Sequence, residues 1–198
     1  MNDSPWDVLD QAHRALRSAV AGVPADGWQR PTPCEQWDVA QVLQHAAGDQ
    51  LAYVAKLTGG PGPDYDPFEP SGTLDGSPTT LLEPALVASA AAFATVDPSD
   101  TDVPVPVPPF TLPANRAVEA AALDATIHAW DIAVATGQRS PLTPSLAQAL
   151  RPVADALVEP LRGYAYGTAI EPASDADEAT SLLNYLGRRS DWTHGPRS

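Results

Sequence analysis

The stretch Asp124-Ala125-Thr126-Ile127-His128-Ala129-Trp130-Asp131 decides how this chain is organised. Asp124 and His128 are four residues apart, so a helix places them on one face, one turn from each other. The rest of that face is small and apolar, and a carboxylate and an imidazole are costly to bury there unless something pairs with them. Such a pair can chelate a divalent metal ion. A hydrogen-bonded pair in a helical core is the commoner arrangement, and both interpretations stay open at this point.

Helices dominate the rest of the predicted structure. Apolar residues recur at helical spacing in six segments, with further signals at their ends. The segments cover residues 5–20, 38–57, 81–96, 116–136, 143–161 and, starting at either Asp175 or Asp177, the residues up to 186. Ser4 and Pro5 suit the start of the first helix, and Asp38 with Gln41 forms a capping-box pattern at the start of the second. Pro152 predicts a kink or break in the fifth.

Two connections between these helices are long. Residues 58–80 are rich in Gly, Pro, Asp and Ser, which is typical of either a functional or a disordered loop. Tyr65 and Phe68 within this loop are candidate pocket walls. In residues 97–113 valine alternates with proline, which excludes a central strand and predicts an extended connector. At most a short pair of strands is expected around residues 103–112.

These elements predict a single all-α domain over residues 1–198, because neither an internal repeat nor a second domain is visible. The expected architecture is an antiparallel four-helix bundle over about residues 4–137. A short C-terminal helical extension is expected over about residues 138–198.

The composition excludes several classes of partner. The chain has 25 acidic and 11 basic residues, a net charge of -14, and no basic run, so neither nucleic acid nor an anionic membrane surface is an expected partner. No apolar run approaches the length of a membrane span, and the acidic residues 1–10 do not resemble a signal peptide. Cys34 is the single cysteine, so no internal disulfide is possible. We therefore expect a cytoplasmic protein with a small-molecule substrate, and the sequence leaves open whether it forms a homodimer.

A metal site is the strongest functional hypothesis. His45 flanks the apolar stripe of the second predicted helix, and facing helices of a bundle can supply ligands to one ion. With Asp124 and His128 it would provide two imidazoles and one carboxylate. That set suits zinc with a position left for water or substrate, and it also suits iron or another divalent ion. A histidine hydrogen-bonded to a neighbour at the edge of the stripe is the alternative for His45.

Two aspartates are candidates for a supporting role around these ligands. Asp131 follows His128 by three residues and could accept the free N–H of a metal-bound imidazole. A helix cap or an interhelical hydrogen bond is the plain alternative for Asp131. Asp49 lies one turn beyond His45 on the same side of its helix.

Three other residues with reactive side chains are not expected to take part in catalysis or metal binding. Cys34 has no histidine near it in the sequence and lies in a loop that is predicted to be structural, so a nucleophilic role is not expected. His13 falls off the apolar stripe of the first helix and is predicted to be a solvated surface residue. His194 lies near the end of the chain and is expected to be disordered.

Three separated motifs resemble those of a known family. They are Thr32-Pro33-Cys34-Glu35-Gln36-Trp37-Asp38-Val39 followed by His45; Asp124-x3-His128-Ala129-Trp130-Asp131 with Ala135-Thr136-Gly137; and Leu182-Leu183-Asn184-Tyr185-Leu186-Gly187-Arg188 with Trp192. In this order they are similar to the DinB-like superfamily. More narrowly, they resemble the mycothiol-dependent maleylpyruvate isomerase-like group of actinobacterial metal-binding proteins.

The resemblance implies an up-down-down-up bundle with one divalent metal, held here by His45, Asp124 and His128, and mycothiol as a cosubstrate. The chain departs from the group in two ways. The acid is commonly Glu, and Asp124 is shorter by one methylene. The family's isomerases also carry a larger C-terminal domain that helps to bind substrate. We therefore expect a thiol-dependent transferase or isomerase acting on a small electrophile other than maleylpyruvate, and a non-catalytic metal- or ligand-binding accessory protein is the alternative.

Overall fold

Six α-helices and one pair of short strands make up the described part of the computed structural model, residues 6–193. The helices are α1 Asp7–Ala21, α2 Val39–Thr58, α3 Pro78–Phe93, α4 Ala114–Ala135, α5 Pro144–Leu161 and α6 Glu178–Tyr185, and the strands are β1 Val103–Pro104 and β2 Thr111–Leu112. The fold is an all-α DinB-like bundle, as predicted. Ser4, Pro5 and His194 lie outside the described residues.

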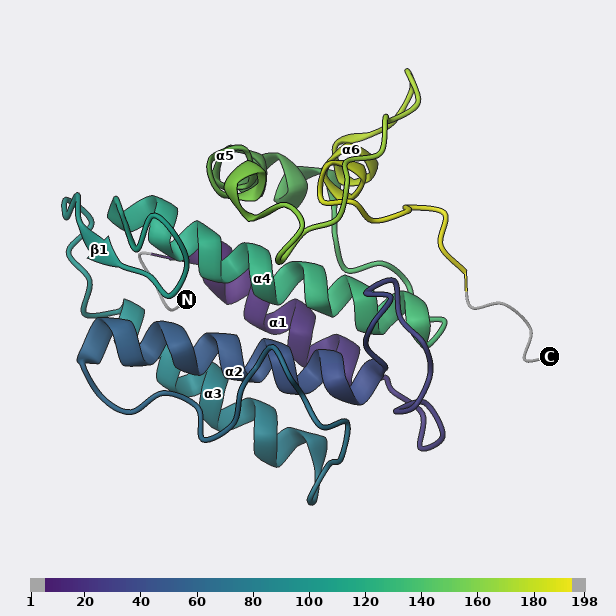
Figure 1. Ribbon diagram of the computed structural model, residues 1–198, viewed down its shortest axis with the longest axis horizontal. Helices are drawn as coiled ribbons and strands as arrows, with labels where there is room; N and C mark the ends of the chain where they lie inside the picture. Colours follow the sequence, from purple (N-terminus) through teal and green to yellow (C-terminus); the bar gives the residue numbers. More distant parts are fainter. Residues whose placement is uncertain (1–5, 194–198) are drawn as a thin grey trace.

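Helix α4 is the centre of the bundle (Figure 1). It packs against α1 and α2, and α2 packs in turn against α3. Most side chains of α4 are buried on all sides, as expected of a helix that its neighbours enclose. Helices α5 and α6 form a further layer over α4 in Figure 1. Within the described residues, no helix is both long enough and apolar enough to cross a membrane.

Local signals define where the helices begin and end. The Asp38 carboxylate accepts a hydrogen bond from the backbone N–H of Gln41, whose side chain accepts one from the Asp38 N–H, so the predicted capping box is present. Thr143 caps α5, and Asp177, one of the two predicted residues, caps α6. Gly59 ends α2 with a φ of 70°, a conformation that glycine adopts without strain. The Asp38 capping box and Gly59 mark the two ends of α2, the helix that carries His45.

Two predicted helix starts were wrong, and a break at Pro152, one of the two predicted outcomes there, is absent. The first helix begins at Asp7, with Trp6 at its N-cap and no side-chain cap. Helix α3 begins at Pro78, a turn earlier than predicted, because proline suits the first position of a helix. Helix α5 runs through Pro152 without a break. Its buried side chains on both sides of this proline, Leu150 and Val153, pack into the core, and packing offsets the missing hydrogen bond.

His13 is buried and not a surface residue as predicted. Its side chain is on the buried face of α1 and is only 2% exposed. Its Nε2 lies 3.0 Å from Oε1 of Gln50, which also accepts a hydrogen bond from the Ser89 hydroxyl. The Gln50 amide nitrogen donates to the Ala121 carbonyl oxygen. This network satisfies polar groups of four helices inside the core, which is what makes the buried imidazole tolerable.

The proline-rich connector forms a small hairpin before α4. Val103 of β1 pairs with Leu112 of β2 in antiparallel register. This is the short pair of strands that was predicted around residues 103–112. The hairpin contributes Val107 to the wall of the cavity described below.

Candidate metal centre

His45 of α2 and Asp124 and His128 of α4 come together in the structure. One potential ligand atom from each side chain lies within 4.8 Å of the other two. Oδ1 of Asp124 is 3.3 Å from Nε2 of His128 and 3.8 Å from Nε2 of His45. Ligand atoms around a tetrahedral zinc ion are about 3.3 Å apart, so small side-chain adjustments would bring the three atoms around one ion. Asp124 thus reaches both histidines although it is shorter than glutamate.

The second carboxylate oxygen of Asp124 also fits a bound cation. Oδ2 is buried and has no hydrogen-bond donor among the described residues apart from the carboxyl group of Asp49, which interacts with the Asp124 side chain when it is protonated. A metal ion would supply the compensating charge that this buried carboxylate needs. The donor set, two imidazole nitrogens and a carboxylate, is one that zinc and related divalent ions accept.

The backbone selects the tautomer of His45. Its Nδ1 lies 2.9 Å from the carbonyl oxygen of Pro67, and a carbonyl can only accept, so Nδ1 carries the proton. Nε2 therefore directs a lone pair toward Asp124, as a metal ligand must. Burial, and after it the neighbouring His128, lowers the pKa of His45 to about 4, which keeps this imidazole neutral at physiological pH.

Asp131 orients the second imidazole. Its Oδ2 lies 3.1 Å from Nδ1 of His128, so this carboxylate accepts the Nδ1 proton and Nε2 faces Asp124. This contact with the imidazole is the one expected of Asp131, and its predicted support of a metal-bound histidine stays a prediction. Burial opposes a charged imidazole, but the carboxylates of Asp124 and Asp131 outweigh it and raise the pKa of His128 to about 9.

Arg188 in turn holds the carboxylate of Asp131, and the sequence analysis did not identify Arg188 as part of the site. Its Nε and Nη2 atoms donate to Oδ1 and Oδ2 of Asp131 at 3.0 and 2.9 Å. Asp131 is fully buried. Burial alone would raise the pKa of Asp131, but Arg188 and His128 hold it below its usual value. The one available signal was the closing motif, which ends at Arg188.

Asp49 lies beside the cluster without completing it. Its Oδ2 is 3.6 Å from Nε2 of His45, which is too long for a hydrogen bond. Burial and the nearby carboxylate of Asp124 raise the pKa of Asp49 well above its usual value. The supporting role predicted for Asp49 stays a prediction.

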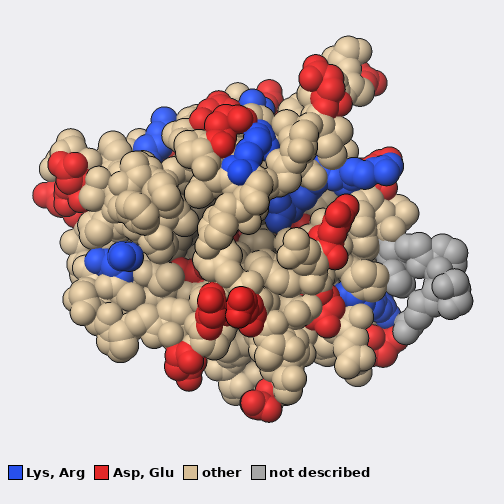
Figure 2. All heavy atoms as spheres, viewed as in Figure 1, with Lys and Arg blue, Asp and Glu red and all other residues tan. Residues whose placement is uncertain are grey.

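The cluster opens into a cavity of about 650 Å³, and Figure 2 shows this face of the molecule hollowed near its centre. The Trp37 ring packs against the His45 ring, with centroids 4.5 Å apart, and Phe68 meets His45 edge-on at 5.3 Å. Phe68 is therefore a pocket wall, as predicted. Tyr65 is not, because its hydroxyl donates to the carbonyl oxygen of Gln44 and attaches the loop to α2.

Cys34 also lines this cavity, but its environment opposes a nucleophilic role. Burial, with Asp131 nearby, raises the pKa of the Cys34 thiol to about 11. A thiol attacks as its thiolate, and this thiol stays protonated at physiological pH.

Fold and cluster together define a DinB-like helical bundle with a buried His-Asp-His group that could hold a metal ion. Residues 9–133 match the family model of the mycothiol maleylpyruvate isomerase N-terminal domain. This segment covers more than half of the chain and contains His45, Asp124 and His128, so the chain belongs to that family.

Similar proteins occur in Mycobacterium tuberculosis. The uncharacterized protein MT0763 of strain CDC 1551 / Oshkosh and the uncharacterized protein Rv0738 of strain ATCC 25618 / H37Rv are each 30% identical to this chain over 189 residues. In both cases the alignment covers 93% of this chain and 97% of the relative. No solved structure matches the chain at a significant level.

Proposed function

We propose that the protein binds one divalent metal ion, zinc, through His45, Asp124 and His128, and that it is an enzyme that uses a small thiol to modify or isomerise a small electrophile. The observation that carries this proposal is the convergence of three ligand atoms within 4.8 Å at a cavity of about 650 Å³. A cavity of this size suits small-molecule ligands. The family to which the chain belongs supports mycothiol as the thiol.

The chain's own residues prepare the ligands. The Pro67 carbonyl and the Asp131 carboxylate each accept an Nδ1 proton, so both Nε2 atoms face Asp124. Nε2 of His45 is free to bind, whereas a metal ion has to displace the Nε2 proton of His128, whose pKa is raised to about 9. With the Asp124 carboxylate they make three protein ligands, and sites of that kind keep a position open for water or substrate.

An external thiol is the better reactant, because the Cys34 thiol is held protonated by burial. A bound divalent ion would supply the positive charge that lowers the pKa of such a thiol. In conjugation, the sulfur forms a bond to one carbon of an activated double bond. The displaced electron pair then takes up a proton at the neighbouring carbon. In isomerisation, the new carbon–sulfur bond breaks again after rotation about the former double bond, and the thiol is released.

Metal content is the first test. Wild-type protein, purified without a histidine tag or added metal, is expected to carry zinc or another divalent metal in near-stoichiometric amount by elemental analysis. His45→Ala and His128→Ala are expected to lose it. His13→Leu is the matched control, because His13 is a buried histidine bonded to Gln50 in the separate core network. Equal metal in the wild type and in both ligand variants would refute the site.

Thiol consumption is the second test. The metal-loaded protein is assayed with mycothiol or N-acetylcysteine and a panel of small electrophiles. Consumption that requires both the metal and His128 supports the enzyme. A fully loaded protein with no rate above background would favour the non-catalytic binding protein.

A further inference from the structure

The lining of the cavity contains little positive charge. Among the described residues that form it, Arg188 is the single side chain with a permanent positive charge, whereas Glu35 and Asp124 bring carboxylates. His128 is a second positive charge only while no metal is bound, because its pKa is raised to about 9. Proteins usually recognise carboxylate and phosphate groups with arginine or lysine. An anionic substrate would therefore meet acidic side chains in this cavity.

The charge of Arg188 is already balanced. Its Nε and Nη2 atoms both donate to the buried carboxylate of Asp131. In the site proposed above, the two positive charges of the metal ion would be matched by Asp124 and by the thiolate. No net positive charge is then left to attract the carboxylate of a second reactant.

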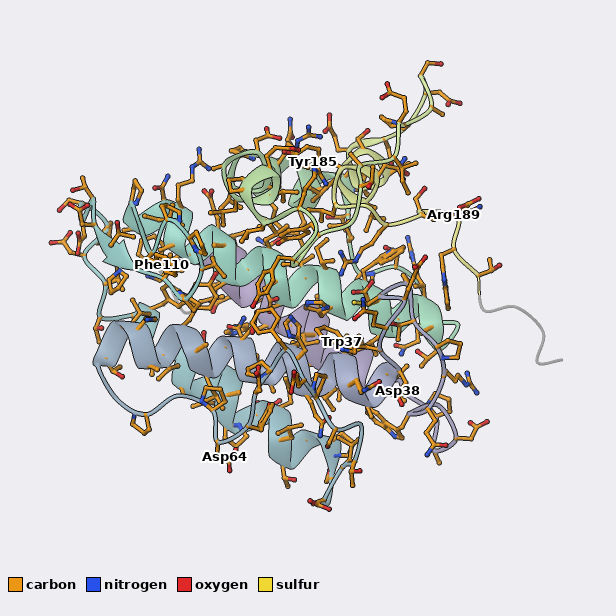
Figure 3. All side chains as sticks on the ribbon, in the orientation of Figure 1. Trp37, Asp38, Asp64, Phe110, Tyr185 and Arg189 are labelled. Atoms are coloured by element: carbon orange, nitrogen blue, oxygen red, sulfur yellow. The ribbon has the colours of Figure 1, made fainter. Side chains whose placement is uncertain are left out.

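Aromatic side chains surround the entrance instead. Phe68 comes from the loop between α2 and α3, Tyr164 from the loop between α5 and α6, and their ring centroids are 5.4 Å apart. Both line the cavity and are nevertheless 37% and 71% exposed. Trp37 lies further in, against the His45 ring, and Figure 3 shows it between α2 and α4. Such rings bind planar apolar groups by stacking and edge contacts.

We infer that the cavity accepts uncharged electrophiles that carry an aromatic or extended apolar group, and that Phe68 and Tyr164 determine this preference. The inference rests on the proposed function and names its substrate class. An α,β-unsaturated ketone with an aryl group fits this description. The sulfur of the thiol bonds to its β-carbon, and the thiol's proton is returned to the α-carbon, so no oxidant or reductant is needed.

Binding tests the inference separately from turnover. Benzylacetone lacks the reactive double bond, and its para-carboxy derivative has the same shape with one negative charge. Equilibrium dialysis of the zinc-loaded protein in the presence of mycothiol, which supplies the thiolate, is expected to show benzylacetone binding about tenfold more tightly than the derivative, since like charges are disfavoured across an interface. Equal or tighter binding of the carboxylate would overturn the inference.

Variants at the entrance test the two aromatic residues. Tyr164→Ala and Phe68→Ala are each expected to weaken benzylacetone binding by about three- to tenfold, whereas Tyr164→Phe keeps it. Phe110→Ala is the matched control, because Phe110 is an exposed aromatic residue on the hairpin that does not line the cavity, and Figure 3 shows it away from Trp37. An equal loss in the Phe110 variant, or no loss in the other two, contradicts the assigned role.

Turnover separates this inference from the proposed function. The zinc-loaded protein is assayed with the thiol and benzylideneacetone, the unsaturated counterpart of benzylacetone. If benzylacetone binds with the expected preference but benzylideneacetone consumes no thiol, the selectivity of the cavity stands and the proposed enzyme fails. If the para-carboxy enone reacts faster than benzylideneacetone, the enzyme stands and the inferred substrate class is wrong.

Discussion

Asp131 and Arg188 form a buried ion pair across 57 residues of sequence, with Nη2 of the arginine 2.9 Å from Oδ2 of the aspartate. The same oxygen lies 3.1 Å from Nδ1 of His128. The segment after α6 therefore fixes the orientation of an imidazole on α4. The family match ends at residue 133, so part of what positions this imidazole lies beyond the matched segment.

Replacing the arginine should destabilise the fold. Arg188→Met leaves the Asp131 carboxylate buried without its cation, and breaking a buried pair in this way costs about 3–5 kcal/mol. We expect a decrease of this size in the free energy of unfolding, measured by urea denaturation. Arg189→Met is the matched control, because its neighbouring ion pair with Asp191 is exposed, and it should leave the free energy of unfolding unchanged.

The double variant isolates the charge. Asp131→Asn combined with Arg188→Met removes both charges, so it should lose less free energy of unfolding than Arg188→Met alone. A larger loss in the double variant would show that packing of the arginine side chain, and not its charge, is what matters.

A glutamate at position 124 should preserve metal binding. The structure shows that Asp124 already reaches both histidines, and the longer glutamate is the acid that the related group commonly has. Asp124→Glu is therefore expected to bind zinc at least as tightly as wild type in a competition titration with a chelator. Asp124→Asn removes the negative charge and is expected to bind at least about tenfold more weakly. Unchanged affinity in the Asn variant would exclude the carboxylate as a ligand.

The Cys34 thiol should react slowly. Its pKa is raised from 9.0 to about 11, so below pH 9 the thiolate fraction falls by about a hundredfold. Alkylation by iodoacetamide should be slower than for a free cysteine by about that factor, and it should recover in urea. Cys34→Ser should retain any metal-dependent thiol consumption. Fast alkylation of the folded protein, or loss of activity in the serine variant, would identify Cys34 as a nucleophile.

The core histidine should make stability depend on pH. Burial lowers the pKa of His13 below its usual 6.5, so the unfolded chain takes up this proton at a higher pH than the folded protein does. Its contribution to stability is therefore fully present above 6.5 and decreases as the pH falls from 6.5 toward the folded-state pKa. His13→Leu should flatten this part of the curve in urea unfolding of metal-free protein.

Above pH 6.5, His13→Leu should lower the free energy of unfolding only slightly. Oε1 of Gln50 keeps its hydrogen bond from Ser89, so only one hydrogen bond is lost, about 1 kcal/mol. His45 also has a lowered pKa, but it is present in both proteins and cancels in the comparison. Identical pH curves for the two proteins would contradict the assignment to His13.

Local chemistry explains what could be predicted from the sequence. The Asp38–Gln41 capping box and the Thr143 cap involve residues three positions apart, so short patterns reveal them. The spacing of Asp124 and His128 needs only a helix to become a shared face. His45 was placed beside them by the bundle and by the family resemblance, and the structure brings the three side chains together.

Tertiary packing explains the rest. His13 is buried because α1 packs against both α3 and α4, and no pattern within α1 reveals how many neighbours cover it. The pairing of Asp131 with Arg188 joins residues that share no local pattern. Tyr65 and Phe68 are three residues apart in one loop, and only its folded path shows that one binds α2 while the other faces the cavity.

The metal-ligand candidates are on two packed helices, whereas Phe68 and Tyr164 are on the loops that cross above them. Loops accept substitutions and changes of length far more readily than the helices they connect. A lineage with this architecture can therefore change the ligands of its cavity by loop divergence while its His-Asp-His cluster is inherited intact. For the protein engineer, the same separation makes the two loops the place to randomise in a library that seeks new ligands for this cavity.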